Sequence, residues 1–146
     1  MRIAVKLWLE AAELGSIQAL YNLGVAHESG DGVQEDKKKA AQFWSKAAMQ
    51  GDVKSRQNLG YLEHEKGNHY RAVRHYLISA KLGDERSLET IKKMFMAGIA
   101  TKEQYTEALV GYQDAVEEMK SRDRDEAKRQ KAKDCLHMSA QDKNEA

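Results

Sequence analysis

The sequence of 146 residues contains no proline and only one cysteine, Cys135. A chain without proline suits consecutive helices whose corners are made by glycine. A single cysteine excludes an intramolecular disulfide and any metal site built from several cysteines. It also permits a reducing compartment. We therefore expect no disulfide framework, no metal and no cofactor.

Long apolar runs are also missing. No stretch reaches the length needed to span a bilayer, and Met1 to Leu14 includes Lys6 and Glu10 instead of the continuous apolar core of a signal peptide. We expect no membrane insertion and favour the cytoplasm as the location. Lys and Arg total 24 against 23 Asp and Glu, so the overall charge directs the chain to neither nucleic acid nor an anionic membrane.

Internal repetition is the main feature that is present. A shift of 36 residues leaves eight of the 21 positions from 4 to 24 identical, where random pairing gives about one. A second shift, of 32 residues, aligns Trp44 with Tyr76 and Gly51 with Gly83, and a weaker third match reaches Tyr112. The eight identities are Ala4 with Ala40, Trp8 with Trp44, Ala11 with Ala47, Ala12 with Ala48, Gly15 with Gly51, Asn22 with Asn58, Leu23 with Leu59, and Gly24 with Gly60.

Each repeat unit reads as a pair of helices, because apolar residues recur every three or four positions. Small residues such as Gly24 and Gly60 allow close helix packing, and large rings such as Trp44 supply bulk. Gly51 is placed to end a helix and Asp52 to begin the next. The predicted helices cover residues 3–14, 17–29, 36–50, 53–66, 69–82, 85–97 and 102–119.

A family resemblance rests on these residues. The segments Ala19-Leu-Tyr-Asn-Leu-Gly24, Gly30-Asp-Gly-Val33 and Lys46-Ala-Ala-Met-Gln-Gly51, together with Asp36, Ala40 and Trp44, resemble one full Sel1-like repeat. The resemblance implies an all-α fold, a short α-α superhelix (solenoid) of Sel1-like or tetratricopeptide-like helix pairs. It also implies a scaffold in multiprotein assemblies.

The expected domain organisation follows from the repeat. Residues 1–119 form the repeat domain, and residues 120–146 form a charged tail that we expect to be frayed or disordered, because apolar periodicity nearly vanishes there. The repeat domain divides into a half repeat at 1–18, a repeat at 19–54, a shortened repeat at 55–86 and a divergent repeat at 87–119, where Lys92 replaces the expected glycine.

Candidate catalytic or metal groups do not form a convincing set. Gly30 and Gly32 fit an interhelical turn, since no strand precedes them. The histidines at 64, 69 and 75 are better explained by packing than by zinc binding. Cys135 and His137 lie in the expected tail, where no third group could orient them for catalysis. The basic run at 128–133 is read as a solvated tail. We therefore predict that the chain is not an enzyme.

The first helix of each pair is expected to line the concave face, as in tetratricopeptide-like stacks. The recurring asparagines could bond the backbone of a bound peptide or, equally well, bond between helices. Exposed cations there could attract acidic groups. The predicted partner-binding residues on this face are Tyr21, Asn22, Val25, Lys54, Gln57, Asn58, Tyr61, Arg86, Glu89 and Lys93.

The function expected from the sequence is a noncatalytic adaptor that binds a peptide or helix of a partner protein. The main alternative is a fragmentary or self-associating repeat protein, because at least three repeats are usually needed for stability. An enzyme is a third class, which would require a convergent set of titratable groups.

Overall fold

The computed structural model describes residues 2–145, which form seven α-helices and no β-strand. All seven predicted helices are present, and the bounds of the first six lie within one residue of the prediction. The helices are α1 (Ile3–Glu13), α2 (Ile17–Ser29), α3 (Lys37–Met49), α4 (Val53–Glu65), α5 (His69–Lys81), α6 (Glu85–Met96) and α7 (Lys102–Glu145).

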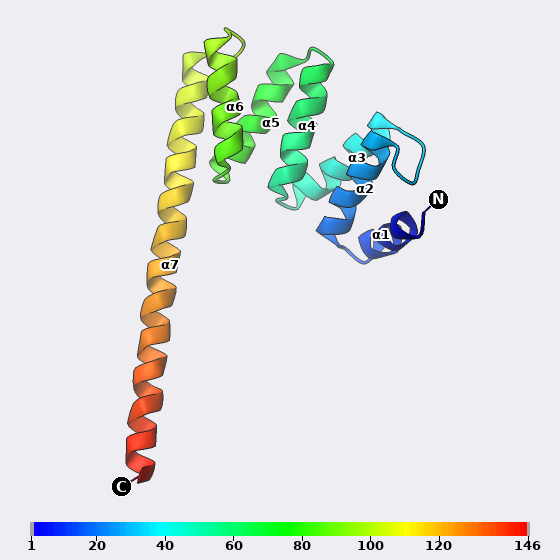
Figure 1. The fold of residues 1–146 in the computed structure, drawn as a ribbon. Helices are drawn as coiled ribbons and strands as arrows, with labels where there is room; N and C mark the ends of the chain where they lie inside the picture. Colours follow the sequence, from blue (N-terminus) through cyan, green and yellow to red (C-terminus); the bar gives the residue numbers. More distant parts are fainter. Residues whose placement is uncertain (1, 146) are drawn as a thin grey trace.

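The helices pack as successive pairs, with α2 against α3, α4 against α5, and α6 against α7. The remaining helix, α1, packs against α2 and corresponds to the second helix of a preceding pair. Figure 1 shows the pairs following one another along a curved path, with α7 projecting far beyond the others. The predicted all-α solenoid is confirmed.

In each of two pairs, an aromatic ring on the second helix packs against a glycine on the first helix and holds the two helices together. The Trp44 side chain is 3% exposed, and a Cβ atom added to Gly24 would lie 2.2 Å from its Nε1 atom. The same indole nitrogen donates a hydrogen bond to the carbonyl oxygen of Tyr21 at 3.2 Å. A Cβ atom at Gly60 would lie 3.0 Å from Tyr76. The absent glycine side chains therefore leave the space that the two rings occupy.

The corners between pairs repeat one local design. Gly51 has a φ of 93°, a left-handed conformation that glycine adopts without a steric penalty. Its N–H donates to the carbonyl oxygen of Ala48 at 3.0 Å. Asp52 then begins α4 by accepting a hydrogen bond from the N–H of Ser55 at 3.0 Å. Asp84 and Ser87 do the same at α6, at 2.7 Å, so the predicted helix ends and starts are confirmed.

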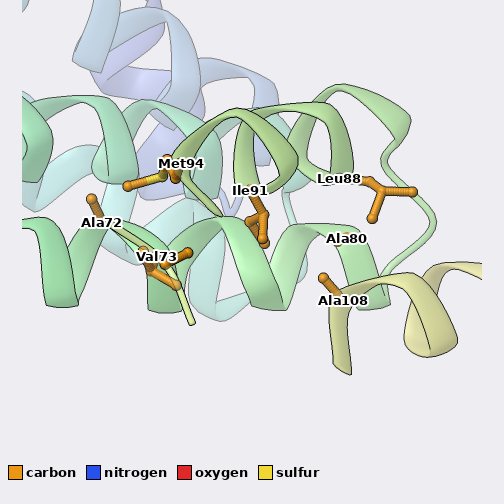
Figure 2. Packing of buried hydrophobic residues seen from close by; sticks show 8 residues of the cluster. Ala72, Val73, Ala80, Leu88, Ile91, Met94 and Ala108 are labelled. Carbon is orange, nitrogen blue, oxygen red and sulfur yellow. The ribbon is translucent and has the colours of Figure 1, made fainter. Parts of the chain in front are cut away.

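The buried residues form three clusters along the stack, so each junction between helix pairs has its own small core. The first lies around Leu23 and the second around Trp44. Figure 2 shows the third, to which α5, α6 and α7 all contribute. Its buried members are Ala72, Val73, Ala80, Leu88, Ile91, Met94, Ala100 and Ala108.

The last helix differs from the prediction. We expected it to end near residue 119 and pass into a frayed or disordered tail, whereas α7 continues to Glu145. The described side chains from 120 to 144 are all exposed, so packing does not hold this part in place. Residues with high helix propensity and local ion pairs support it instead, such as Arg122 with Glu118 at 2.6 Å.

Candidate functional site

The ten predicted partner-binding residues all lie on the first helices of the pairs, α2, α4 and α6. None of them is fully buried. We call the surface that they form the first-helix face. Its members are Tyr21, Asn22 and Val25 from α2, Lys54, Gln57, Asn58 and Tyr61 from α4, and Arg86, Glu89 and Lys93 from α6.

The first-helix face consists of one patch repeated three times. The repeat spacings of 36 and 32 residues place Tyr21, Gln57 and Glu89 at equivalent positions. Val25, Tyr61 and Lys93 are equivalent in the same way, as are Asn22, Asn58 and Thr90. A peptide crossing this face would therefore pass equivalent positions in each repeat unit, although the side chains at those positions differ.

Three of the polar side chains on this face, those of Gln57, Asn22 and Tyr61, have hydrogen-bond partners within the chain. Gln57 Nε2 donates to Asp84 and, at 3.3 Å, to the hydroxyl of Ser87, so it joins α4 to α6. Asn22 Oδ1 accepts a hydrogen bond from Gln18 in its own helix at 3.0 Å. Gln57 thus belongs to a helix contact, while Asn22 stays at the surface.

The middle of the face carries a network around Glu65. The Tyr61 hydroxyl donates to Glu65 Oε1 at 2.9 Å, and Lys37 Nζ lies 3.2 Å from Oε2. The hydrogen bond from Tyr61, followed by that from Lys37, lowers the pKa of the Glu65 carboxyl. The bond to Glu65 also raises the pKa of Lys37 and of Tyr61. The contact between Lys37 and Glu65 links the start of α3 to the end of α4.

Two cavities open on this face, and we name each by the ring that borders it. The Trp8 pocket has a volume of about 190 Å³ and the Tyr76 pocket about 270 Å³. The Trp8 pocket is lined by Trp8, Tyr21, Asn22, Val25, Ala26, Ser29 and Asp31. The Tyr76 pocket is lined by His64, Tyr76, Thr90, Lys93, Met94, Ala97 and Ile99.

A third cavity, of about 670 Å³, lies between α1 and α3, on the side of the second helices. Leu9, Phe43 and Met49 are among its lining residues. Neither this cavity nor the two pockets was predicted from the sequence. The lining positions of the two pockets recur at the repeat spacing, but the side chains at those positions differ, so the spacing alone does not predict the pockets.

Three cations stand free on the first-helix face. Lys54, Arg86 and Lys93 are exposed, and within residues 2–145 none of them is part of an ion pair. Lys93 also lines the Tyr76 pocket. This part of the face therefore has three cations available to pair with carboxylates.

The histidines singled out in the sequence do not form a metal site in the described part of the chain. His64 and His69 are exposed, with their Nδ1 atoms 3.1 Å apart, and His75 is half-buried. Residues 2–145 contain no group of three or more histidine, cysteine or acidic side chains that could hold a metal. None of the described helices is long and apolar enough to cross a membrane.

Successive helix pairs with one surface patch repeated along them define an α-solenoid of helical repeats. The sequence profile of the Sel1 repeat matches residues 1–16, 17–52 and 55–84. The chain therefore belongs to the Sel1 repeat family, whose repeats generally mediate protein–protein interactions as noncatalytic scaffolds.

Solved structures agree with this assignment. A Sel1 repeat protein from Oxalobacter formigenes is 31% identical with a TM-score of 0.64, and the match covers 80% of this chain and 49% of that one. A protective antigen with an SLR fold from uropathogenic Escherichia coli strains is 34% identical with a TM-score of 0.64, covering 78% and 25%. This chain thus spans about half of the first protein and a quarter of the second. A comparison with curated proteins found no match.

Proposed function

We propose that this chain is a noncatalytic adaptor that binds a segment of a partner protein on the first-helix face. The observation that carries the proposal is the patch repeated on α2, α4 and α6, with Lys54, Arg86 and Lys93 unpaired on it. The general role of Sel1 repeats in protein–protein interaction supports it. The partner segment is acidic, because these three cations lie exposed on successive first helices.

The polar groups on the face suit a peptide backbone. Asn22 and Asn58 occupy equivalent positions, and each amide can both donate and accept a hydrogen bond. Within residues 2–145, the Asn58 side chain has no hydrogen-bond partner, so it is free to meet a backbone group. The amides would hold the segment in place, while the cations would add attraction that salt weakens.

Replacing the three cations Lys54, Arg86 and Lys93 together with alanine tests the proposal. The triple variant should lose binding to proteins captured from a lysate of the source organism, and its free energy of unfolding should change by less than about 1 kcal/mol. The matched control replaces Arg71 and Arg74, two exposed cations on α5, with alanine. If the control abolishes capture and the triple variant does not, recognition belongs to the second helices.

Self-association, or continuation by further repeats, is a second candidate function with its own observation. Leu7 in α1 is 56% exposed, whereas its equivalent in α3, Phe43, stacks on His27 of α2 with ring centroids 5.5 Å apart. The side of α1 that a first helix would cover is therefore open in the described chain. Sedimentation equilibrium of the parent chain and of Leu7→Lys tests this. If two copies associate through α1, the parent should have a higher molar mass in solution than the variant.

A further inference from the structure

The Trp8 pocket and the Tyr76 pocket occupy equivalent places in two repeat units. Tyr76 follows Trp8 by 68 residues, the sum of the two repeat spacings. The same shift carries most of the Trp8 pocket onto the Tyr76 pocket. The matching lining residues are Trp8 with Tyr76, Asn22 with Thr90, Val25 with Lys93, Ala26 with Met94, Ser29 with Ala97, and Asp31 with Ile99.

The unit between the two pockets carries larger side chains at the equivalent positions. Glu65 stands where the pockets have the small residues Ser29 and Ala97. Tyr61 stands where they have Val25 and Lys93, and its hydroxyl is bonded to Glu65. The face therefore presents two openings, separated by a middle position whose side chains are already tied to each other.

Each pocket is large enough for one apolar side chain. A buried apolar cavity of about 150 Å³ is enough to bind benzene, and these two measure about 190 and 270 Å³. Each offers an aromatic ring and helix side chains for contact. Among their polar lining residues, Asn22 and Thr90 occupy the same place in the two pockets. An aromatic or branched apolar residue fits such a site.

The separation of the pockets selects the conformation of the ligand. Packed helices lie about 8–10 Å apart, and in this stack the packing runs from each first helix through a second helix to the next first helix. Two units along the stack therefore place the pockets at least about 20 Å from each other. An extended chain covers that distance in about six residues, at roughly 3.3–3.6 Å per residue. A helix rises only 1.5 Å per residue and would need about twice as many.

The charges around the two pockets differ, so they favour one orientation of a bound peptide. Lys93 lines the Tyr76 pocket, and Arg86 lies on the same helix, unpaired. At the Trp8 pocket, Asp31 is present and is paired with Arg2 at 2.7 Å. A carboxylate is therefore favoured beside the side chain that enters the Tyr76 pocket.

Resting on the proposed function, we propose that the first-helix face binds an extended partner segment through two apolar anchors about six residues or a few more apart, one in each pocket, with an acidic residue beside the anchor in the Tyr76 pocket. The middle unit, with Tyr61 and Glu65, lies under the stretch between the anchors. Specificity then comes from the distance between the anchors as well as from their chemistry.

Synthetic peptides of glycine, serine and asparagine test the inference, each with two phenylalanines and aspartates beside one of them. The number of residues from one phenylalanine to the other varies from two to ten, and fluorescence anisotropy measures the Kd for the full chain. Affinity should be low at the shortest separations and should peak at about six residues or a few more. The peak should exceed that of peptides with one phenylalanine by about tenfold or more, the gain expected from burying one large apolar side chain.

The two tryptophans report where the peptide binds. Trp8 lines a pocket, while Trp44 is buried within the stack. In spectra of the ¹⁵N-labelled chain, the indole signal of Trp8 should move on titration and that of Trp44 should not. Movement of Trp44 alone contradicts the assignment.

Filling the pockets one at a time gives a matched set of variants. Ser29→Leu fills the Trp8 pocket and Ala97→Leu fills the Tyr76 pocket, both at exposed positions. Each substitution should raise the Kd of the tightest-binding peptide about tenfold. Ser45→Leu, at an exposed position that lines the large cavity on the other side, should leave the Kd of that peptide unchanged.

The outcomes separate the inference from the function on which it rests. The inference is wrong if affinity does not depend on the separation of the anchors, or if Ser29→Leu and Ala97→Leu act no more strongly than Ser45→Leu. The adaptor function still holds in that case if the triple cation variant loses capture from lysate. If the triple variant keeps capture, the function itself fails.

Discussion

The repeat region and the distal part of α7, residues 120–145, share a helical backbone but are stabilised in different ways. In the repeat region each helix buries one side, as α3 does with Ala40 and Trp44. In distal α7 the described side chains are exposed, and contacts such as that between Arg122 and Glu118 connect residues four apart. Apolar periodicity therefore predicts where a helix packs, and it says less about where the helix ends.

The largest expected effect is on stability, from a substitution in the core of the repeat region. Trp44→Ala should lower the free energy of unfolding by about 3–5 kcal/mol, because it removes a buried ring and leaves a cavity between α2 and α3. Urea denaturation followed by far-UV circular dichroism measures the loss. A loss below about 1 kcal/mol, typical of surface positions, would mean that the ring does not hold the pair together.

A pair of glycine variants sharpens the same point. A methyl group at Gly24 would lie 2.2 Å from the Trp44 ring, whereas one at Gly60 would lie 3.0 Å from Tyr76. Gly24→Ala should therefore cost about 1–3 kcal/mol through overpacking. Gly60→Ala should stay within about 1 kcal/mol, because its smaller clash is offset by the higher helix propensity of alanine. The reverse order in denaturation midpoints contradicts the geometry.

A pH effect of smaller size is expected at His75, which takes the position of Phe43 in the shortened repeat. Burial, followed by the charge of Arg56, lowers the pKa of His75 in the folded chain. The unfolded chain therefore binds this proton more readily, and stability should fall as pH drops below about 6.5, the ordinary pKa of histidine. His75→Phe should reduce that slope in denaturation curves recorded between pH 5 and 8. An unchanged slope assigns the effect to another group.

The smallest effect is expected from removing distal α7. A chain ending at Met119 should keep nearly the same Tm, with unfolding free energy within about 0.5 kcal/mol, since the described side chains from 120 to 144 are all exposed. High salt should reduce the helix signal in far-UV circular dichroism more for the parent than for the shortened chain, because salt screens the ion pairs of distal α7. Unfolding of the shortened chain would place the boundary of the repeat domain further along α7.

Much of the fold could be predicted from the sequence, because the repeat constrains it at many positions at once. Gly24 and Trp44 recur as Gly60 and Tyr76, and the structure packs each glycine against the ring of its own pair. The end of α7 was mispredicted for the opposite reason. Beyond Met119 the pattern of burial stops, but helix propensity and local charge pairs do not.

The candidate site could be predicted only in part. Placing residues on the first helices of the pairs needs only the repeat and the helix bounds, and all ten lie within α2, α4 and α6. That they bind a partner stays a prediction. The partners of Gln57, which are Asp84 and Ser87 on the next helix, depend on how neighbouring pairs sit together. The pockets depend on small side chains such as Ser29 and Ala97, one turn beyond the predicted residues. Neither feature follows from periodicity.

The length of α7 has a mechanical consequence. Residues 120–145 extend about 39 Å at 1.5 Å per residue, and they are anchored only at the end where α7 packs against α5 and α6. At that end, a Cβ atom at Gly111 would lie 2.5 Å from Lys81, so the two helices meet with little clearance. By geometry, tilting the helix by about 10° at its base moves the tip by about 7 Å, given that rise per residue. A rigid helix of this length would turn a small change in its contacts with α5 into a displacement several times larger at the far end.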